Sequence, residues 1–459
     1  VFEGSGIESI TLSQKLEVIG DRTFKDCVNL KEFTIPATVL TIGAEAFSGC
    51  TSVEEINVPS GVEIIGNDAF EGAEKLAKVT LPDTIAQVNG NPFRNCFNLT
   101  QIVNNSPNLK FIDGVLYDAD GFTLIYAPVT TTGDIVMLDT VREVAPGAFA
   151  GSKITSVVIS DYVEAIPART FMNCTELKSV VISGNVKTIG DNAFEGCSKL
   201  EGVFIPKSVV EIGEAAFKGC ASMASVEFEE RNTTFTLGAS VFENCSSITA
   251  VELPSFISKL PDYAFAGTGI VNLVIPESVT DLTGDGVFAN CASLETVTWH
   301  DGLAGSLGYR LFMNCTSLQS ITIPENITCL GRYDRSKWTY YGDVFKGCTN
   351  LASVEFLGGD DYGCTIAGYT FDGCMKLTSL VMPGSEWWYD TNAFSGAGFT
   401  SLTLPSTYET GYNLFEDCPN LETITFEELG CVYDLFEGCT ATTIYINNVY
   451  DVWCVDLDL

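Results

Sequence analysis

The chain has 459 residues, of which 46% are apolar, and its formal net charge is −35, from 24 Lys and Arg against 59 Asp and Glu. A polyanion of this kind repels nucleic acid and anionic membrane surfaces, so the composition excludes both as favoured partners. No run of about 18 apolar residues is present, so we expect no direct membrane insertion by this segment.

From its first residues the chain repeats one phrase, L-x-x-I-x-I-P-x-x-V-x-x-I-G-x-x-A-F-x-G-C. "VFEGSGIESITLS" at 1–13 matches "AFAGSKITSVVIS" at 148–160, so the sequence starts halfway through a repeat. Because an open end exposes core, we expect more chain before Val1 or a neighbouring molecule stacked there. The phrase contains Phe2, Phe24, Phe47, Phe70, Phe93, Phe149, Phe171, Phe194, Phe217, Phe242, Phe265, Phe288, Phe312, Phe345, Phe371, Phe394, Phe415 and Phe436.

Each repeat predicts one coil of a β-rich solenoid. L-x-x-I-x-I alternates, which indicates a short strand with its apolar side chains inside, and V-x-x-I indicates a second extended segment. We expect the following glycine to allow a tight bend and the phenylalanine to place its ring in the interior. A period of this length is typical of stacked repeats, so we predict about nineteen coils of about 23 residues, with a short strand in each and little helix.

The cysteines follow the same register. Thirteen of the 17 stand three residues after the repeated phenylalanine, where other coils have Ser5, Ala73, Ser152, Thr268 or Ala397. No C-x-x-C pair is present, so we expect no metal site and no cofactor. Side chains stacked in a ladder point the same way, which suits the disulfide torsion badly. We therefore predict a ladder of reduced, buried thiols that serve as packing.

The phrase I-G-x-x-A-F-x-G-C-x-x-L-x-x-I-x-I-P resembles the repeat of the BspA-like leucine-rich repeat family, from Phe2 to about Ile446. The resemblance implies a leucine-rich-repeat solenoid without shared catalytic residues, secreted or attached to the cell surface, with a role in adhesion. It also implies a small hairpin in "KFIDGVLYDADGFTLIYAP" at 110–128, which two Asp-Gly turns divide into short strands.

These observations predict one continuous solenoid over residues 1–446, with a hairpin insertion at about 105–134, a loop insertion at 332–341 and an irregular C-terminal end at 447–459. His300 is the only histidine, which is too little for a catalytic triad or an imidazole metal site. We expect a non-catalytic extracellular or cell-surface scaffold that binds protein or glycan. The alternative is a structural subunit of an extracellular fibre, sheath or appendage, assembled from copies of the chain.

Departures from the repeat are the candidate binding residues. Nine of 16 tyrosines and three of five tryptophans lie in residues 331–433, between the strand and the repeated phenylalanine. Aromatic side chains with polar tips suit contacts with sugars or protein. The alternative is that these rings pack on each other as local core. The candidates are Tyr333, Trp338, Tyr340, Tyr341, Trp387, Trp388 and Tyr389.

Two further sets are weaker candidates. The outward residue of I-x-I is apolar in five consecutive coils, which predicts a contact stripe unless the hairpin covers it or β-branched residues simply suit strands. The stripe contains Val103, Val136, Val158, Val181 and Phe204. Seven asparagines precede x-Ser/Thr and are glycosylation sequons only in a secreted eukaryotic protein. They are Asn98, Asn104, Asn173, Asn232, Asn244, Asn314 and Asn326.

Overall fold

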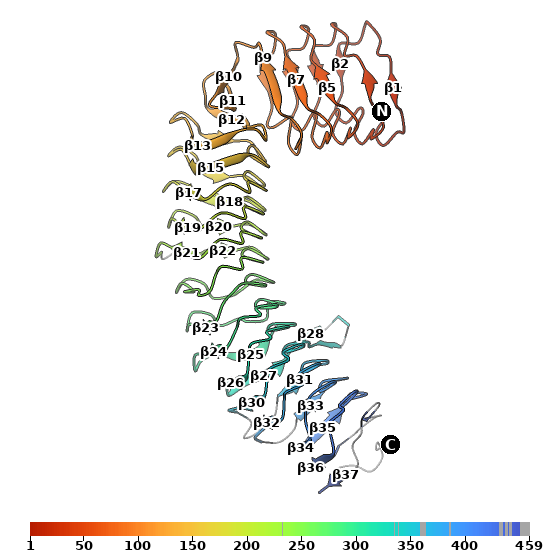
Figure 1. The fold of residues 1–459 in the computed structure, drawn as a ribbon, viewed down its shortest axis with the longest axis vertical. Coiled ribbons are helices and arrows are strands. Elements are labelled where there is room, and N and C mark those ends of the chain that lie inside the picture. Colours follow the sequence, from red (N-terminus) through yellow and green to blue (C-terminus); the bar gives the residue numbers. More distant parts are fainter. Residues whose placement is uncertain are drawn as a thin grey trace. The chain divides into compact units, whose positions relative to one another are not determined.

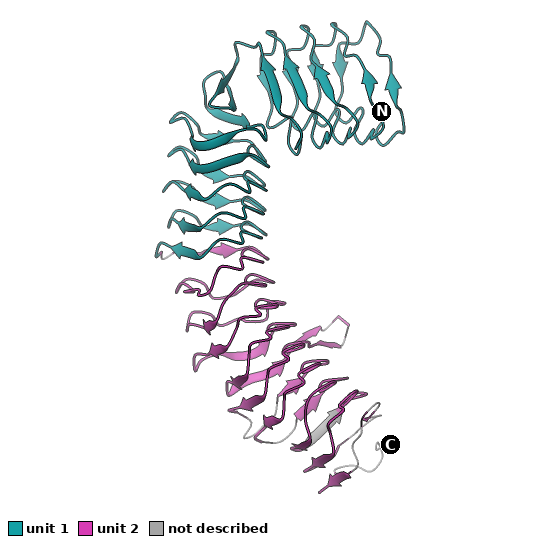
Figure 2. Ribbon diagram, in the orientation of Figure 1, with its two compact units in different colours: residues 1–230 teal, residues 231–459 magenta. Residues whose placement is uncertain are grey.

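The structure, a computed structural model, describes residues 1–231, 233–334, 336–337, 339–358, 364–384, 387–430, 435–436, 439 and 443–449. It divides into two compact units, Val1–Glu230 and Arg231–Leu459 (Figure 2). Each unit is a stack of coils built from short strands, and the described ranges contain no helix (Figure 1). The prediction of a β-rich solenoid with little helix is confirmed. That residues 1–446 form a single continuous solenoid stays a prediction.

In unit 1 the strands lie in two columns, one for each extended segment of the repeat. The first column contains β1 (Ser9–Ile10), β3 (Glu32–Phe33), β5 (Glu55–Asn57), β7 (Lys78–Leu81), β9 (Gln101–Asn104), β13 (Thr132–Val136), β15 (Lys153–Val158), β17 (Ser179–Val181), β19 (Gly202–Ile205) and β21 (Ser225–Phe228). The second contains β2 (Val18–Ile19), β4 (Thr41–Ile42), β6 (Ile64–Ile65), β8 (Gln87–Val88), β14 (Glu143–Val144), β16 (Ala165–Ile166), β18 (Thr188–Ile189) and β20 (Glu211–Ile212).

Unit 2 repeats this arrangement. Its first column contains β23 (Asn272–Val274), β24 (Thr296–Thr298), β26 (Ser320–Ile323), β30 (Ser353–Phe356), β32 (Ser379–Val381), β34 (Ser401–Leu404), β36 (Thr423–Phe426) and β37 (Thr443–Ile446). Its second contains β22 (Thr236–Leu237), β25 (Ala304–Leu307), β27 (Asn326–Leu330), β31 (Thr365–Ile366), β33 (Trp387–Tyr389) and β35 (Thr407–Thr410). An added hairpin consists of β28 (Arg332–Asp334) and β29 (Thr339–Tyr341).

Neighbouring coils pair in parallel, one repeat apart, so that equivalent side chains lie on top of one another. Ile19 pairs with Ile42, and Ile42 pairs with Ile65. The rings of Phe24 and Phe47 stack with centroids 5.2 Å apart and planes 19° apart. All of these side chains are buried. The interior of each unit is therefore a set of columns in which each coil covers the apolar face of the one before it.

In most steps of the described cysteine ladder the thiol donates a hydrogen bond to a phenylalanine carbonyl of the preceding coil. The Cys50 thiol donates to the carbonyl oxygen of Phe24 at 3.2 Å, and the Cys197 thiol donates to that of Phe171 at 3.1 Å. Where serine takes the slot, the Ser152 hydroxyl lies 3.4 Å from the Cys174 sulfur. All fifteen described cysteines are free thiols, fourteen of them buried. In the described residues the ladder is packing, as predicted.

The turn around most of the repeated phenylalanines has two left-handed residues, at two positions before the phenylalanine and two after it. Around Phe194, Asn192 has φ 56° and Gly196 has φ 72°. The sequence predicted that the glycine of the I-G pair allows a tight bend. This role is corrected, because Gly213 has no positive φ. Instead, a Cβ on Gly213 would lie 2.6 Å from the backbone nitrogen of Asp191 and would clash with the Asp191 carboxylate. The glycine therefore permits close approach between coils.

The hairpin of unit 1 consists of β10 (Leu109–Ile112), β11 (Val115–Asp118) and β12 (Thr123–Tyr126), joined as antiparallel neighbours. Asp113 and Gly114 have φ 50° and 82°, the positive pair that a two-residue turn favours. β12 then pairs in parallel with β14, so the hairpin returns to the second column. Its buried Tyr126 ring lies 5.6 Å from Phe93, and thereby continues the ring column in a coil whose sequence lacks the repeated phenylalanine.

Candidate binding site

The insertion in unit 2 forms an antiparallel hairpin anchored to an earlier coil. β28 and β29 pair Arg332 with Tyr341 and Tyr333 with Tyr340. Arg332 Nη2 lies 3.3 Å from Asp285 Oδ2, and this ion pair holds the first strand. The Tyr333 and Tyr340 rings are 4.7 Å apart. Trp338, the remaining candidate of this segment, lies outside the described residues.

Two residues of the predicted aromatic surface belong to the core. Trp387 is 1% exposed and its ring lies 4.9 Å from Phe356, while Tyr389 is 2% exposed and lies 5.6 Å from Phe394. Trp388 between them is 40% exposed. The prediction that Trp387 and Tyr389 form a contact surface is therefore wrong, because they occupy the inward positions of an alternating strand. The alternative interpretation, local packing, holds for both.

A hollow of about 410 Å³ opens beside β29. Its aromatic lining consists of Tyr309, Tyr340, Tyr341 and Tyr369, and we call it the tyrosine hollow. The Tyr309 and Tyr341 ring centroids are 5.6 Å apart with planes tilted by 59°. The structure thus brings two of the predicted candidates, Tyr340 and Tyr341, together with two tyrosines from the adjacent coils.

Three charged residues complete the lining: Asp343, Lys346 and Asp390. Arg310 Nε donates to Asp343 Oδ2 at 3.1 Å, which orients that carboxylate. Lys346 Nζ lies 2.8 Å from Asp372 Oδ2 and 4.9 Å from the centre of the Tyr369 ring. Since Arg310 and Lys346 each have a carboxylate partner, neither presents an uncompensated charge to a ligand.

Asp390 is a carboxyl group of the tyrosine hollow with a raised pKa. Burial raises the pKa of Asp390 above its usual value, although hydrogen bonds from the N–H groups of Thr391 and Gly368 lower it in part. The Thr391 N–H bond to Asp390 Oδ1 measures 2.8 Å. Two fixed carboxyl groups beside four phenol rings form a site of hydrogen-bonding groups within a largely aromatic wall.

Tyr309, Asp343, Lys346 and Asp390 were not among the predicted site residues. Tyr309 stands three residues before Phe312, where Asp191 and Asp262 precede their own phenylalanines, so an aromatic residue at that position was the available signal. The contacts between these side chains depend on the path of the insertion, which the repeat pattern does not specify.

The apolar stripe is partly present in unit 1. Val136 pairs with Val158, which pairs with Val181, and Phe204 lies at the same position of β19. All four are exposed. Val103 is half-buried and belongs to a separate sheet formed by β5, β7 and β9, so it does not continue the stripe. A contact role for the remaining four stays a prediction.

Three of the sequon asparagines have a backbone reason for their identity. Asn173, Asn244 and Asn314 have φ of 58°, 61° and 60°, at the left-handed position two residues after the phenylalanine. Asparagine tolerates that conformation better than most residues. Asn98 Nδ2 donates to the Glu74 carbonyl and Asn104 Nδ2 to the Leu109 carbonyl, at 2.6 and 3.0 Å. Asn326 is exposed, and Asn232 lies outside the described residues.

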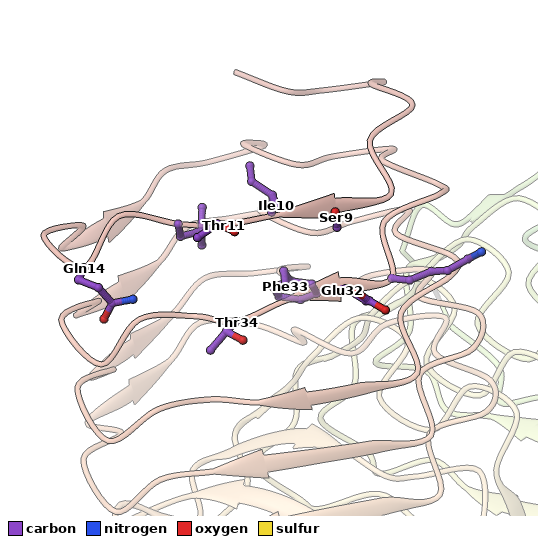
Figure 3. A pocket seen from close by; sticks show the side chains of 9 residues that line it. Ser9, Ile10, Thr11, Gln14, Glu32, Phe33 and Thr34 are labelled. Carbon is purple, nitrogen blue, oxygen red and sulfur yellow. The ribbon is translucent and has the colours of Figure 1, made fainter.

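A second hollow, of about 480 Å³, lies beside β1 and β3 (Figure 3). Ser9, Thr11, Glu32 and Thr34 line it. Its one aromatic ring, Phe33, stacks on Phe47 with centroids 4.8 Å apart. This hollow therefore offers a ligand mainly polar groups, and it carries less binding chemistry than the tyrosine hollow.

His300 is engaged by backbone groups in the structure. The Gly302 N–H donates to its Nδ1 at 3.1 Å, so the proton lies on Nε2, which donates to the Val279 carbonyl at 2.9 Å. Among the described residues, no group of three His, Cys, Asp or Glu side chains has an arrangement that would hold a metal ion. None of the described segments is a helix of the length and apolarity needed to cross a bilayer.

Stacked coils with parallel strands and columns of Leu, Ile and Phe inside define the class of leucine-rich-repeat solenoids. Within that class, the chain belongs to the family of the BspA type leucine-rich repeat region, which matches residues 1–120, 142–268, 235–334 and 339–452. No curated protein matches the chain.

Three solved structures to which this chain is similar come from bacteria. A leucine-rich cell surface protein from Faecalibacterium prausnitzii is 22% identical, with a TM-score of 0.46, over 82% of this chain and 87% of that one. A leucine-rich repeat protein from Bacteroides ovatus is 20% identical, with a TM-score of 0.37, over 91% and 78%. The pneumococcal vaccine antigen PcpA is 20% identical, with a TM-score of 0.44, over 63% and 74%.

Proposed function

We propose that this protein is a non-catalytic scaffold, outside the cell or at its surface, that binds a glycan through the tyrosine hollow. Membership of a repeat family whose members are typically secreted or surface-attached supports the location. The observation that supports the binding role is the hollow itself, with four tyrosines around two fixed carboxyl groups. Its volume of about 410 Å³ lies in the range of small-molecule sites.

The chemistry of the lining favours an uncharged sugar over an anion. Phenol rings offer flat faces to the C–H groups of a pyranose, and their hydroxyls and the Asp343 and Asp390 carboxyl groups are hydrogen-bonding partners for sugar hydroxyls. The nearby cations Arg310 and Lys346 are each compensated by an aspartate. A ligand with its own negative charge would therefore find no uncompensated cation in the tyrosine hollow.

The test uses Tyr369→Asn in the whole chain. Tyr369 is 42% exposed and has φ 56°, and the equivalent position holds Asn192 and Asn392, so the variant keeps a residue that the repeat accepts. We expect wild-type protein to bind uncharged glycans on a printed array, and the variant to bind the same glycans roughly tenfold more weakly, the effect of about 1.4 kcal/mol. Tyr162→Ser, which removes an exposed tyrosine of unit 1, is the control and should bind normally.

Binding only to extracellular matrix proteins spotted on the same array would contradict the glycan assignment. Equal binding by Tyr369→Asn and wild type would contradict the tyrosine hollow as the place of contact.

A further inference from the structure

Phe97 departs from the repeat on the surface of unit 1. It directly follows the cysteine slot, where other coils have residues such as Thr51, Ala221 or Met375 but no other aromatic ring. Its side chain is 43% exposed. The ring lies against Gly151, since a Cβ on that glycine would be 3.0 Å from Phe97 Cδ1. The same Cβ would also lie close to Val129 Cγ1, so Val129 borders this contact. A glycine two coils away in space thus leaves room for a flat ring that the repeat does not need.

This ring forms one wall of a hollow of about 460 Å³, which we call the Phe97 hollow. The hollow exists because the hairpin coil, with Val129 and Thr130, separates the coil of Phe97 from the coil of Gly151. Its polar lining consists of Asn98, Thr100, Thr130, Lys153 and Asn173. Several of these groups are fixed: the Thr130 hydroxyl donates to the Thr100 carbonyl at 3.4 Å, and the Asn98 amide is held by Glu74.

The charge of the Phe97 hollow differs from that of the tyrosine hollow. None of its lining residues, all of them described, is an aspartate or a glutamate, although the chain has 59 of these residues. Lys153 is the one charged residue of the lining, and it is exposed at the start of β15. Its backbone N–H donates to the Thr131 carbonyl at 2.9 Å, which fixes the point from which the side chain extends.

We propose that the Phe97 hollow is a second binding site, for a sugar that carries a carboxylate, such as a uronic acid residue of an acidic polysaccharide. The Phe97 ring stacks on the C–H face of the sugar. The Lys153 ammonium pairs with the sugar carboxylate in a charge-assisted hydrogen bond. The amides and hydroxyls of Asn98, Asn173 and Thr100 bind the ring hydroxyls. The site is separate from the tyrosine hollow. It takes a negatively charged sugar, whereas the tyrosine hollow takes an uncharged one.

The experiment measures binding of a galacturonate tetrasaccharide and of its methyl-esterified, uncharged counterpart by titration calorimetry at low salt. Wild-type protein is expected to bind the acid at least tenfold more tightly than the ester, because only the acid makes the charge-assisted hydrogen bond with Lys153. Phe97→Thr, which introduces a residue that several other coils have at this position, is expected to weaken binding of the acid about tenfold. Lys153→Gln is expected to reduce the affinity for the acid to the affinity for the ester. Lys178→Gln, an exposed lysine of the next coil outside the hollow, should change neither.

No saturable binding of the acid by wild-type protein, or equal binding by Phe97→Thr, would overturn the site. If Phe97→Thr lost affinity and Lys153→Gln had no effect, the assignment of the ligand as a sugar with a carboxylate would be overturned. The result is distinguishable from the function proposed above, because Tyr369→Asn lies in unit 2 and should leave the galacturonate titration unchanged.

Discussion

The thiol of Cys197 donates a hydrogen bond to the backbone carbonyl of Phe171 in the preceding coil, with its sulfur 3.1 Å from the oxygen. The same relation joins Cys220 to Phe194 at 3.2 Å and Cys374 to Phe345 at 3.2 Å. The slot is therefore limited first by volume: cysteine, serine and threonine add a weak donor, whereas Ala73 and Ala397 fill it without one.

Substitutions of Cys197 should rank by volume. Cys197→Ala removes the hydrogen bond and leaves little space, so we expect a loss of about 1 kcal/mol in the free energy of unfolding. Cys197→Leu adds atoms between stacked coils and should lose about 1–3 kcal/mol or more. Urea unfolding of the three proteins measures both effects. An alanine variant less stable than the leucine variant would show that the slot is not limited by space.

The buried thiols predict alkaline destabilisation. Burial raises the pKa of Cys50, Cys96 and Cys348 to about 12 each, whereas an unfolded thiol titrates near about 8.5. Above about pH 8.5 the unfolded chain has lost these protons and the native chain has kept them, so the free energy of unfolding falls as pH rises. Each such thiol contributes a slope of up to about 1.4 kcal/mol per pH unit.

Unfolding midpoints measured between about pH 7 and about pH 9.5 test this slope, because tyrosine side chains titrate above that range. The double variant Cys50→Ala, Cys96→Ala should show a shallower decline than wild type. A parallel decline in both proteins would mean that these thiols are not the cause.

Two glycines of unit 1 should respond oppositely to alanine. A Cβ on Gly213 would lie 2.6 Å from the Asp191 nitrogen and 2.8 Å from the Gly190 carbonyl carbon, both backbone atoms of the neighbouring coil. At Gly184, which has no positive φ, a Cβ would meet no other atom within 4 Å. We expect Gly213→Ala to lower the thermal midpoint strongly and Gly184→Ala to leave it unchanged or raise it by reducing the freedom of the unfolded chain. Equal midpoints for the two variants would contradict the close stacking at Gly213.

The adjacent tryptophans of β33 differ in burial, since Trp387 lies in the core and Trp388 lies at the surface. Trp387→Ala removes a fully buried ring and should lose about 3–5 kcal/mol of stability. Trp388→Ala removes a ring that is 40% exposed and should lose far less. Chemical unfolding of both variants gives the comparison. If Trp388→Ala proved the more damaging of the two, the inward and outward faces of β33 would be reversed.

The columns of the fold were predictable because each repeat encodes its own coil. Phe194, Cys197 and Leu200 face inward for the same local reasons as their counterparts one repeat away. The prediction failed where the phrase is replaced. Trp387 and Tyr389 were placed on the surface because "EWWYD" has no repeat residue to show which side chains face inward.

The candidate sites were less predictable than the columns. Tyr126 continues the ring column from a hairpin, a contact that depends on the pairing of β12 with β14 rather than on spacing along the chain. The tyrosine hollow was foreseen only in Tyr340 and Tyr341, since its other residues come from coils before and after the insertion. Phe97 stands directly after the cysteine slot as an aromatic residue, but the sequence does not show the glycine beside its ring.

A count of thiols, without reductant, tests most directly the claim that the repeated core is inert packing and that binding lies in the departures from it. The account predicts that a thiol reagent detects at least the fifteen described cysteines in the unfolded protein, and that the fourteen buried ones react only slowly in the folded protein at pH 8. Fewer than fifteen thiols after unfolding, or rapid reaction of the ladder cysteines in the folded state, would contradict it.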